Sequence, residues 1–260
     1  MFYHLLTKED KISEELFNEV KTLKEIVIPP SVESIERCVF YNCKSLIRIS
    51  IQSAVKRIKS HAFCGCSSLI DIELPASIIS IGKHSFDGCS KLKSINLPST
   101  ITTIEHYCFY GCRLLLHIII PSSVTSIEIS IFKGCSSLTR INIPTSIKSI
   151  ESSSSSMCTS LNQVTFDFLS SVISTGEYSF HECLSLTQIT IPSSVTSIGE
   201  YAFSGCSSLT QITIPSSVTS IGNYAFNGCS SLTQITIPSS VTENGNNAFS
   251  GCSSLTPSKI

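Results

Sequence analysis

The chain has 260 residues, and its 18 basic and 19 acidic side chains leave a net charge of −1 at pH 7. Hydrophobic residues make up 42% of it and charged residues only 14%, which excludes a disordered chain and argues against broad electrostatic binding to nucleic acid. The longest apolar run, residues 114–120, is interrupted by His117 and is far shorter than the roughly 20 residues of a membrane helix. No integral membrane segment is therefore predicted.

The first predicted element is an N-terminal helical cap over residues 1–22. Thr7 and Asp10 fit the pattern of a helix N-terminus, and Ile12 and Leu16 fall on one face of the expected helix. The apolar run at the start of the chain is too short for a conventional secretion signal. The helix is expected to cover the apolar end of the first repeat, which would otherwise meet water.

A period of 23 residues runs through the rest of the chain and is interrupted once, by a two-residue insertion between Phe166 and Val172. Three columns of apolar residues follow this period, and Ser155 alone interrupts the Phe column. The Cys column holds residues 43, 66, 89, 112, 135, 158, 183, 206, 229 and 252; the Phe column holds 40, 63, 86, 109, 132, 180, 203, 226 and 249; the Leu column runs from 46 to 255.

The unit at residues 209–231 shows how one repeat is expected to fold. Ile212 and Ile214 alternate with threonines, which is the pattern of a short strand with one buried face, and Pro215 ends that strand. A second extended piece is expected around Ile221, and about one helical turn is expected before the Cys of the repeat. One repeat buries too few apolar side chains to offset the entropy of ordering 23 residues, so the coils must stack.

The repeat pattern Leu-x-x-Ile-x-Ile-Pro-x-x-Val-x-x-Ile-Gly-x-x-Ala-Phe-x-x-Cys resembles the leucine-rich repeats of the BspA-like type, over about residues 17–256. The resemblance implies a leucine-rich-repeat solenoid of the α/β horseshoe type, rich in β-structure, with parallel stacked short strands and about ten coils. Proteins of this type look like surface adhesins, so the resemblance also implies binding to host matrix or to partner cells.

The chain is expected to form one solenoid over residues 1–260, whose regularity changes along its length. The expected parts are the N-terminal helical cap (1–22), varied repeats (23–161), an irregular joint that holds the insertion (162–185), near-identical repeats (186–256) and a C-terminal tail (257–260).

No catalytic or cofactor site is predicted. Ten of the 13 cysteines share one repeat position and are expected to point inward as small apolar side chains, so neither disulfides nor a zinc site is expected from them. The six histidines fall at scattered repeat positions, and no serine sits in a nucleophile-elbow setting. An enzyme is not expected, and neither is a metal or another cofactor.

The outward face of the stacked strands is the predicted binding surface for a protein partner. Its C-terminal half is a uniform column of Gln and Thr, which is expected to satisfy itself by side-chain hydrogen bonds. Its N-terminal half mixes charge, histidine and an exposed isoleucine, which suits selective recognition. The predicted contact residues are Arg48, Asp71, Glu73, His117, Ile119 and Arg140.

Three functions remain open from the residues. The first is an intracellular, cytoplasmic adaptor, which the free thiols and the lack of a visible secretion signal favour. The second is a surface adhesin that reaches the cell surface by unconventional secretion and binds an extracellular matrix protein, which the resemblance favours. The third is a structural protein that self-associates end to end through unpaired strand edges.

Overall fold

The computed structural model describes residues 21–52 and 54–255, which form twenty short strands, two in each of ten coils. The first strands of the coils are β1 (Glu25–Ile28), β3 (Arg48–Ile51), β5 (Asp71–Glu73), β7 (Ser94–Asn96), β9 (His117–Ile119), β11 (Arg140–Ile143), β13 (Gln163–Phe166), β15 (Gln188–Thr190), β17 (Gln211–Thr213) and β19 (Gln234–Thr236). The second strands are β2 (Ser34–Ile35), β4 (Arg57–Ile58), β6 (Ser80–Ile81), β8 (Thr103–Ile104), β10 (Ser126–Ile127), β12 (Ser149–Ile150), β14 (Ser174–Thr175), β16 (Ser197–Ile198), β18 (Ser220–Ile221) and β20 (Glu243–Asn244).

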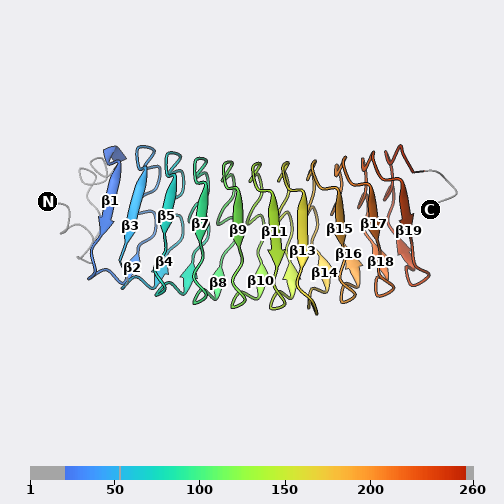
Figure 1. Cartoon of the computed structure of the whole chain (residues 1–260), viewed down its shortest axis with the longest axis horizontal. Coiled ribbons are helices and arrows are strands. Elements are labelled where there is room, and N and C mark those ends of the chain that lie inside the picture. The colour runs from blue at the N-terminus through green and yellow to red at the C-terminus, as the bar shows by residue number, and fades with distance from the viewer. Residues whose placement is uncertain (1–20, 53, 256–260) are drawn as a thin grey trace.

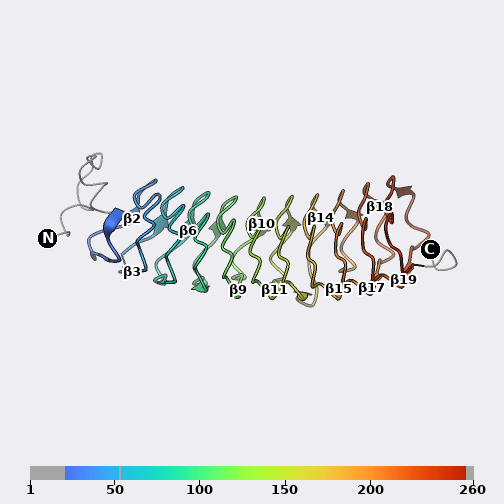
Figure 2. The same cartoon turned by 90° about the horizontal axis from the view of Figure 1, so that it is seen from above.

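The coils follow one another in a single, nearly straight row (Figure 1). The first strands line one side of the row and the second strands line the opposite side, as the view from above shows (Figure 2). Every strand pair is parallel, and each residue pairs with the one that occupies the same repeat position, as Gln211 does with Gln234. The predicted solenoid of parallel strands with a 23-residue period is therefore confirmed.

The core lies between the two rows of strands and is built from the predicted columns. All ten cysteines of the Cys column and nine leucines of the Leu column are buried, and eight phenylalanines of the Phe column are at most 2% exposed. Successive phenylalanine rings stack, with the ring centres of Phe203 and Phe226 5.4 Å apart and nearly parallel. A ring inside a stack therefore contacts both the coil before it and the coil after it, which joins neighbouring coils through the core.

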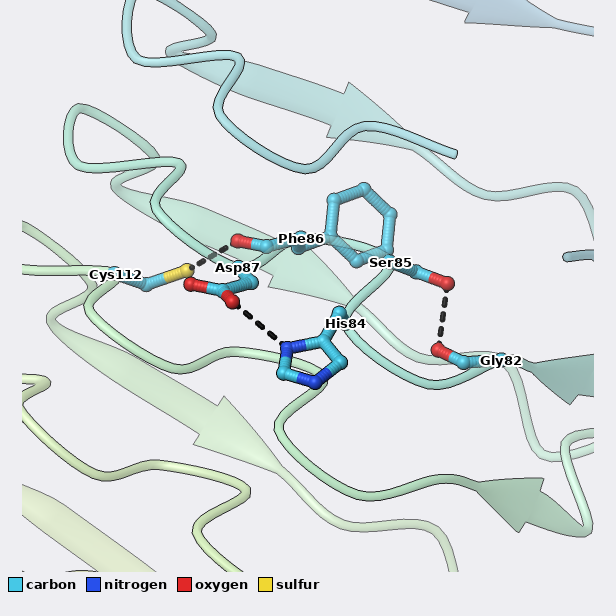
Figure 3. Close-up of polar contacts among 6 residues, drawn as sticks. All are labelled: Gly82, His84, Ser85, Phe86, Asp87 and Cys112. Atoms are coloured by element: carbon cyan, nitrogen blue, oxygen red, sulfur yellow. Dashed lines mark hydrogen bonds and ion pairs between the residues drawn. The ribbon is translucent and has the colours of Figure 1, made fainter. Parts of the chain in front are cut away.

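The cysteine column has a second role beside filling space. Each thiol of the column from Cys66 to Cys252 donates a hydrogen bond to a backbone carbonyl of the preceding coil, over 3.1–3.3 Å. Figure 3 shows one such bond, from Cys112 Sγ to the Phe86 carbonyl, at 3.2 Å. Sequence reasoning identified these side chains only as small apolar groups. These carbonyls also accept a backbone N–H, as Phe226 does from Cys229, so the thiol is a second donor to an oxygen with two lone pairs, which an alanine could not supply.

The segment before each Cys differs from the expected helical turn. At Tyr224 the backbone takes a positive φ of 55°, and Gly228 does so again at 73°. Two kinds of backbone hydrogen bond occur in this segment. Some close a short turn, as from Cys229 N–H to the Phe226 carbonyl, and others join neighbouring coils, as from Phe226 N–H to the Ala248 carbonyl. A continuous helix is excluded because residues with left-handed backbone recur within five positions, and stacking satisfies the backbone groups instead.

The predicted N-terminal helical cap over residues 1–22 finds no support in the described part of the chain. Residues 1–20 lie outside the described residues, and only Lys21 and Thr22 of the predicted cap are described. Both have helical backbone, but two residues make less than one helical turn, and every element named in residues 21–52 and 54–255 is a strand. The predicted tail at residues 257–260 also lies outside the described residues.

The two-residue insertion forms an outward loop between β13 and β14. Phe168 and Leu169 at its tip are 89% and 77% exposed, and Leu169 has a positive φ of 65°, which strains a branched side chain. In the preceding coil, that of β11 and β12, Ser155 occupies the phenylalanine column at 3% exposure, so the ring stack stops at Phe132 and resumes at Phe180. Phe180, in the coil of β13 and β14, therefore has no ring to stack on in the coil before it.

We expect the coil of β13 and β14 to open more readily than the regular ones. Backbone amides of residues 163–176 should exchange with deuterium faster than those of residues 211–222, because the interrupted ring stack leaves fewer buried contacts to break. Native-state hydrogen exchange followed by mass spectrometry of peptides checks this directly. Equal, slow exchange in both segments would show that the insertion and Ser155 do not weaken the joint.

Candidate binding face

The first strands present one face to the outside, because alternate residues of a strand point to opposite sides. In β5, for example, Ile72 is buried while Asp71 and Glu73 are exposed, and β9 repeats this with Ile118 buried. All six predicted contact residues lie on this outward face and all are exposed.

The predicted residues fall into two groups on the face. Arg48 is paired in register with Asp71, and Glu73 lies in the same strand as Asp71. The Arg48 guanidinium also forms an ion pair with Glu25, at 3.8 Å between Nη1 and Oε1. Both groups of that pair are mostly exposed, so solvent screens it and it contributes little to stability.

The second group lies two coils further along, where His117 is paired in register with Arg140. Ile119 lies in the same strand as His117 and is 74% exposed, the largest exposure of any isoleucine, leucine or valine outside the insertion loop among residues 21–52 and 54–255. The coil of β7 separates the two groups, and Ser94 and Asn96 are its outward strand residues. The six residues therefore form two neighbouring clusters rather than one.

The structure adds apolar residues to the second cluster that sequence reasoning missed. Leu114 and Leu116 are 42% and 48% exposed, directly before β9, and Ile70 is 38% exposed two coils earlier. The sequence does carry a signal for them. The two positions that flank the buried Leu of each repeat hold Ser and Thr in the C-terminal coils, but they hold Leu114 and Leu116 in this coil.

The C-terminal half of the face is as uniform as expected, with Gln188, Gln211 and Gln234 in register. The predicted hydrogen bonds between these side chains are absent, however, in the described part of the chain. Threonines one position earlier hold the coils together instead, since the Thr210 hydroxyl donates to the Thr187 carbonyl at 3.1 Å. A hydroxyl next to the backbone reaches the preceding coil with little entropy cost, whereas a long Gln side chain must be ordered first.

Polar side chains also gather at the turns, away from the strand face. His84 Nδ1 lies 2.8 Å from Asp87 Oδ2, and the Ser85 hydroxyl donates to the Gly82 carbonyl (Figure 3). The nearby thiol of Cys64 has its pKa raised to about 11 by burial and by the carboxylate of Asp87, so it is not a thiolate nucleophile at neutral pH.

No set of three His, Cys, Asp or Glu side chains able to hold a metal ion occurs among residues 21–52 and 54–255. In the same residues, no helix has the length and apolar character needed to cross a membrane.

The repeat geometry matches one protein family over nearly the whole chain. The family model described as the BspA type leucine-rich repeat region matches residues 5–115, 57–183 and 173–260. The chain belongs to the BspA-type leucine-rich repeat family. The resemblance identified from the repeat pattern is thus confirmed. Solenoids of this family are typically non-enzymatic scaffolds.

Solved structures of bacterial leucine-rich repeat proteins share the fold. A leucine-rich cell surface protein of Faecalibacterium prausnitzii is 30% identical, with a TM-score of 0.51, over 90% of this chain and 78% of that one. A leucine-rich repeat protein of T. pallidum is 26% identical, with a TM-score of 0.50, over 82% of this chain and 79% of that one. The pneumococcal vaccine antigen PcpA is 22% identical, with a TM-score of 0.58, over 90% of this chain and 61% of that one. No curated protein matches.

Proposed function

We propose that this chain is a non-catalytic scaffold that binds a protein partner through the outward face of its first strands. The observation that carries the proposal is the contrast between the two halves of that face. In the C-terminal half Gln and Thr repeat in register, whereas the N-terminal half presents Arg48, Asp71, Glu73, His117, Ile119 and Arg140. Varied charge beside exposed apolar groups gives a surface the means to discriminate between partners.

Two cellular locations for this binding are proposed, the cell surface and the cytoplasm. The similarity to a cell surface protein of Faecalibacterium prausnitzii favours a surface adhesin, whose partner would be a host or matrix protein. The 13 free cysteines favour a cytoplasmic adaptor, because oxidising compartments promote disulfides. Antibody labelling of intact cells against permeabilised cells separates the two.

The test of binding compares matched charge changes on the two halves. The wild-type chain is immobilised and captured proteins are identified by mass spectrometry, beside a triple variant with Arg48→Glu, Glu73→Arg and Arg140→Glu. A control triple variant carries Gln188→Glu, Gln211→Arg and Gln234→Glu, at exposed positions in the column that Arg48 and Arg140 also occupy. We expect a protein that the wild type and the control both capture and that the first variant loses.

A partner retained by the first variant would show that this part of the face is not the binding site. Circular dichroism spectra of both variants should match the wild type, because exposed substitutions rarely change stability by more than about 0.5 kcal/mol.

A further inference from the structure

The coils around β9 combine exposed apolar side chains with cations that have no partner. Four basic residues surround the exposed leucines and Ile119 there, and none of the four forms an ion pair among residues 21–52 and 54–255. They are Lys91, Lys93, Arg113 and Arg140, and all four are exposed. Arg48, Lys56 and Lys59, in the coil of β3 and β4, differ, since each forms an ion pair with a glutamate.

Backbone hydrogen bonds fix the order of these side chains along the row. Lys93 N–H donates to the Ile70 carbonyl at 3.0 Å, and Leu116 N–H donates to the Lys93 carbonyl at 3.1 Å. Lys93 therefore lies between two exposed apolar side chains, one coil from each. On the far side Thr139 N–H donates to the Leu116 carbonyl at 3.2 Å, which places Arg140 on the coil next to Leu116.

From this arrangement we propose that the face of β7, β9 and β11 binds an acidic segment of a partner protein that carries apolar side chains. This inference rests on the proposed function and specifies the partner's chemistry. Leu114, Leu116 and Ile119 supply the apolar contacts, and the four unpaired cations supply the complementary charge. Because their charges are not satisfied within the chain, carboxylates of a partner are the groups that gain most by approaching them.

The acidic residues of β5 set one end of this site. Asp71 and Glu73 are exposed one coil before Ser94 and Asn96, and neither forms an ion pair with a neighbour in the described residues. They repel carboxylates, so the acidic segment binds over β7 to β11 and does not extend to β5. A basic residue of the partner would fit at that end, which gives the bound segment a direction.

The probe for the test is a short synthetic peptide in which glutamates alternate with leucines, labelled for fluorescence anisotropy. We expect it to bind the wild-type chain, more weakly as salt is raised because exposed charges are screened. A peptide with glutamine in place of every glutamate should bind at least about tenfold more weakly. A double variant Lys93→Glu and Arg140→Glu should lose the acidic peptide to the same extent.

Two further variants separate charge from apolar contact. Leu116→Ser with Ile119→Ser should weaken binding while leaving its salt dependence in place, because the cations remain. Gln211→Glu with Gln234→Glu, at the column of Arg140 in the uniform half, should leave the affinity unchanged. The inference is overturned if the acidic peptide does not bind, if the glutamine peptide binds equally well, or if the Lys93 and Arg140 variant binds as the wild type does.

Failure here and failure of the proposed function give different results. Suppose that capture of a partner is lost when Arg140 is changed, but that this partner has no acidic segment. The scaffold function would then be supported, and only the proposed acidic chemistry of the partner would be overturned.

Discussion

Raising the pH from 8 to about 10 is expected to unfold this protein through its cysteines. Ten thiols are 0% exposed, and burial raises the pKa of nine of them above the ordinary value of 9.0, to about 11 at Cys43 and about 12 at Cys158 and Cys206. The other six are Cys66, Cys89, Cys108, Cys112, Cys135 and Cys183. The folded chain therefore keeps these protons at a pH where the unfolded chain releases them.

The direction of the effect follows from proton binding. Below pH 9 both states hold the thiol protons and the stability is complete; above pH 9 the unfolded state binds fewer protons, so stability falls until the folded pKa values are reached. One pH unit above the ordinary pKa costs about 1.4 kcal/mol for each thiol, and nine thiols together cost about 13 kcal/mol. A domain has a total stability of about 5–15 kcal/mol, so unfolding near pH 10 is the expected outcome.

The measurement is the free energy of unfolding in urea, determined between pH 8 and 10 with a reducing agent present. A variant with Cys135→Ala, Cys158→Ala and Cys183→Ala is the control for the thiol contribution. Its stability should fall less steeply with pH, with a loss smaller by about 1.4 kcal/mol between pH 8 and pH 10 for each thiol removed. If the slopes of the variant and the wild type were equal, the tyrosines or other groups would be responsible instead.

Replacing Phe203 by Ala is expected to lower the free energy of unfolding by about 3–5 kcal/mol. Phe203 is 0% exposed and its ring stacks on Phe180 before it and on Phe226 after it, at 5.4 Å in both cases. Its removal leaves a cavity that the neighbouring coils cannot fill, because their spacing is fixed by strand pairing on both sides. Urea unfolding followed by circular dichroism measures the loss, since the chain has no tryptophan to report by fluorescence.

The same substitution at the end of the column is a matched control. Phe249 stacks only on Phe226 and is partly buried, so Phe249→Ala should cost clearly less than Phe203→Ala. An equal cost at both positions would mean that the ring stack contributes nothing beyond the burial of a single side chain. A further control, Thr213→Ala on the exposed face, should change stability by no more than about 0.5 kcal/mol.

Most of the fold could be predicted because each column of the sequence is sampled about ten times. The alternation around Ile212 is weak by itself, but its return at Ile189 and Ile235 indicates both a strand and the register of its neighbours. Stacking at the same repeat position follows, since only that register keeps every apolar side chain inside. The buried columns and the outward position of the six predicted contact residues could be derived in this way.

What could not be predicted depends on contacts between coils that no single repeat displays. The left-handed backbone at Tyr224 is compatible with many sequences, and the bonds that support it come from the next coil. The thiol of Cys112 would be read as a small apolar group unless the distance to the Phe86 carbonyl were known. Lys93 is unpaired because no carboxylate of the described residues lies within ion-pair distance, and such distances cannot be read from sequence spacing alone.

The identical register of β15, β17 and β19 has a consequence for how such a chain can change in length. Each of these coils offers the next one the same surface, from Ile189 to Ile212 to Ile235, so a coil could be removed or duplicated without disturbing its neighbours. One such event would move everything beyond it by about 4.8 Å along the row. The gain or loss of one such coil would therefore change the length of the row and leave the strand face from β3 to β11 unchanged.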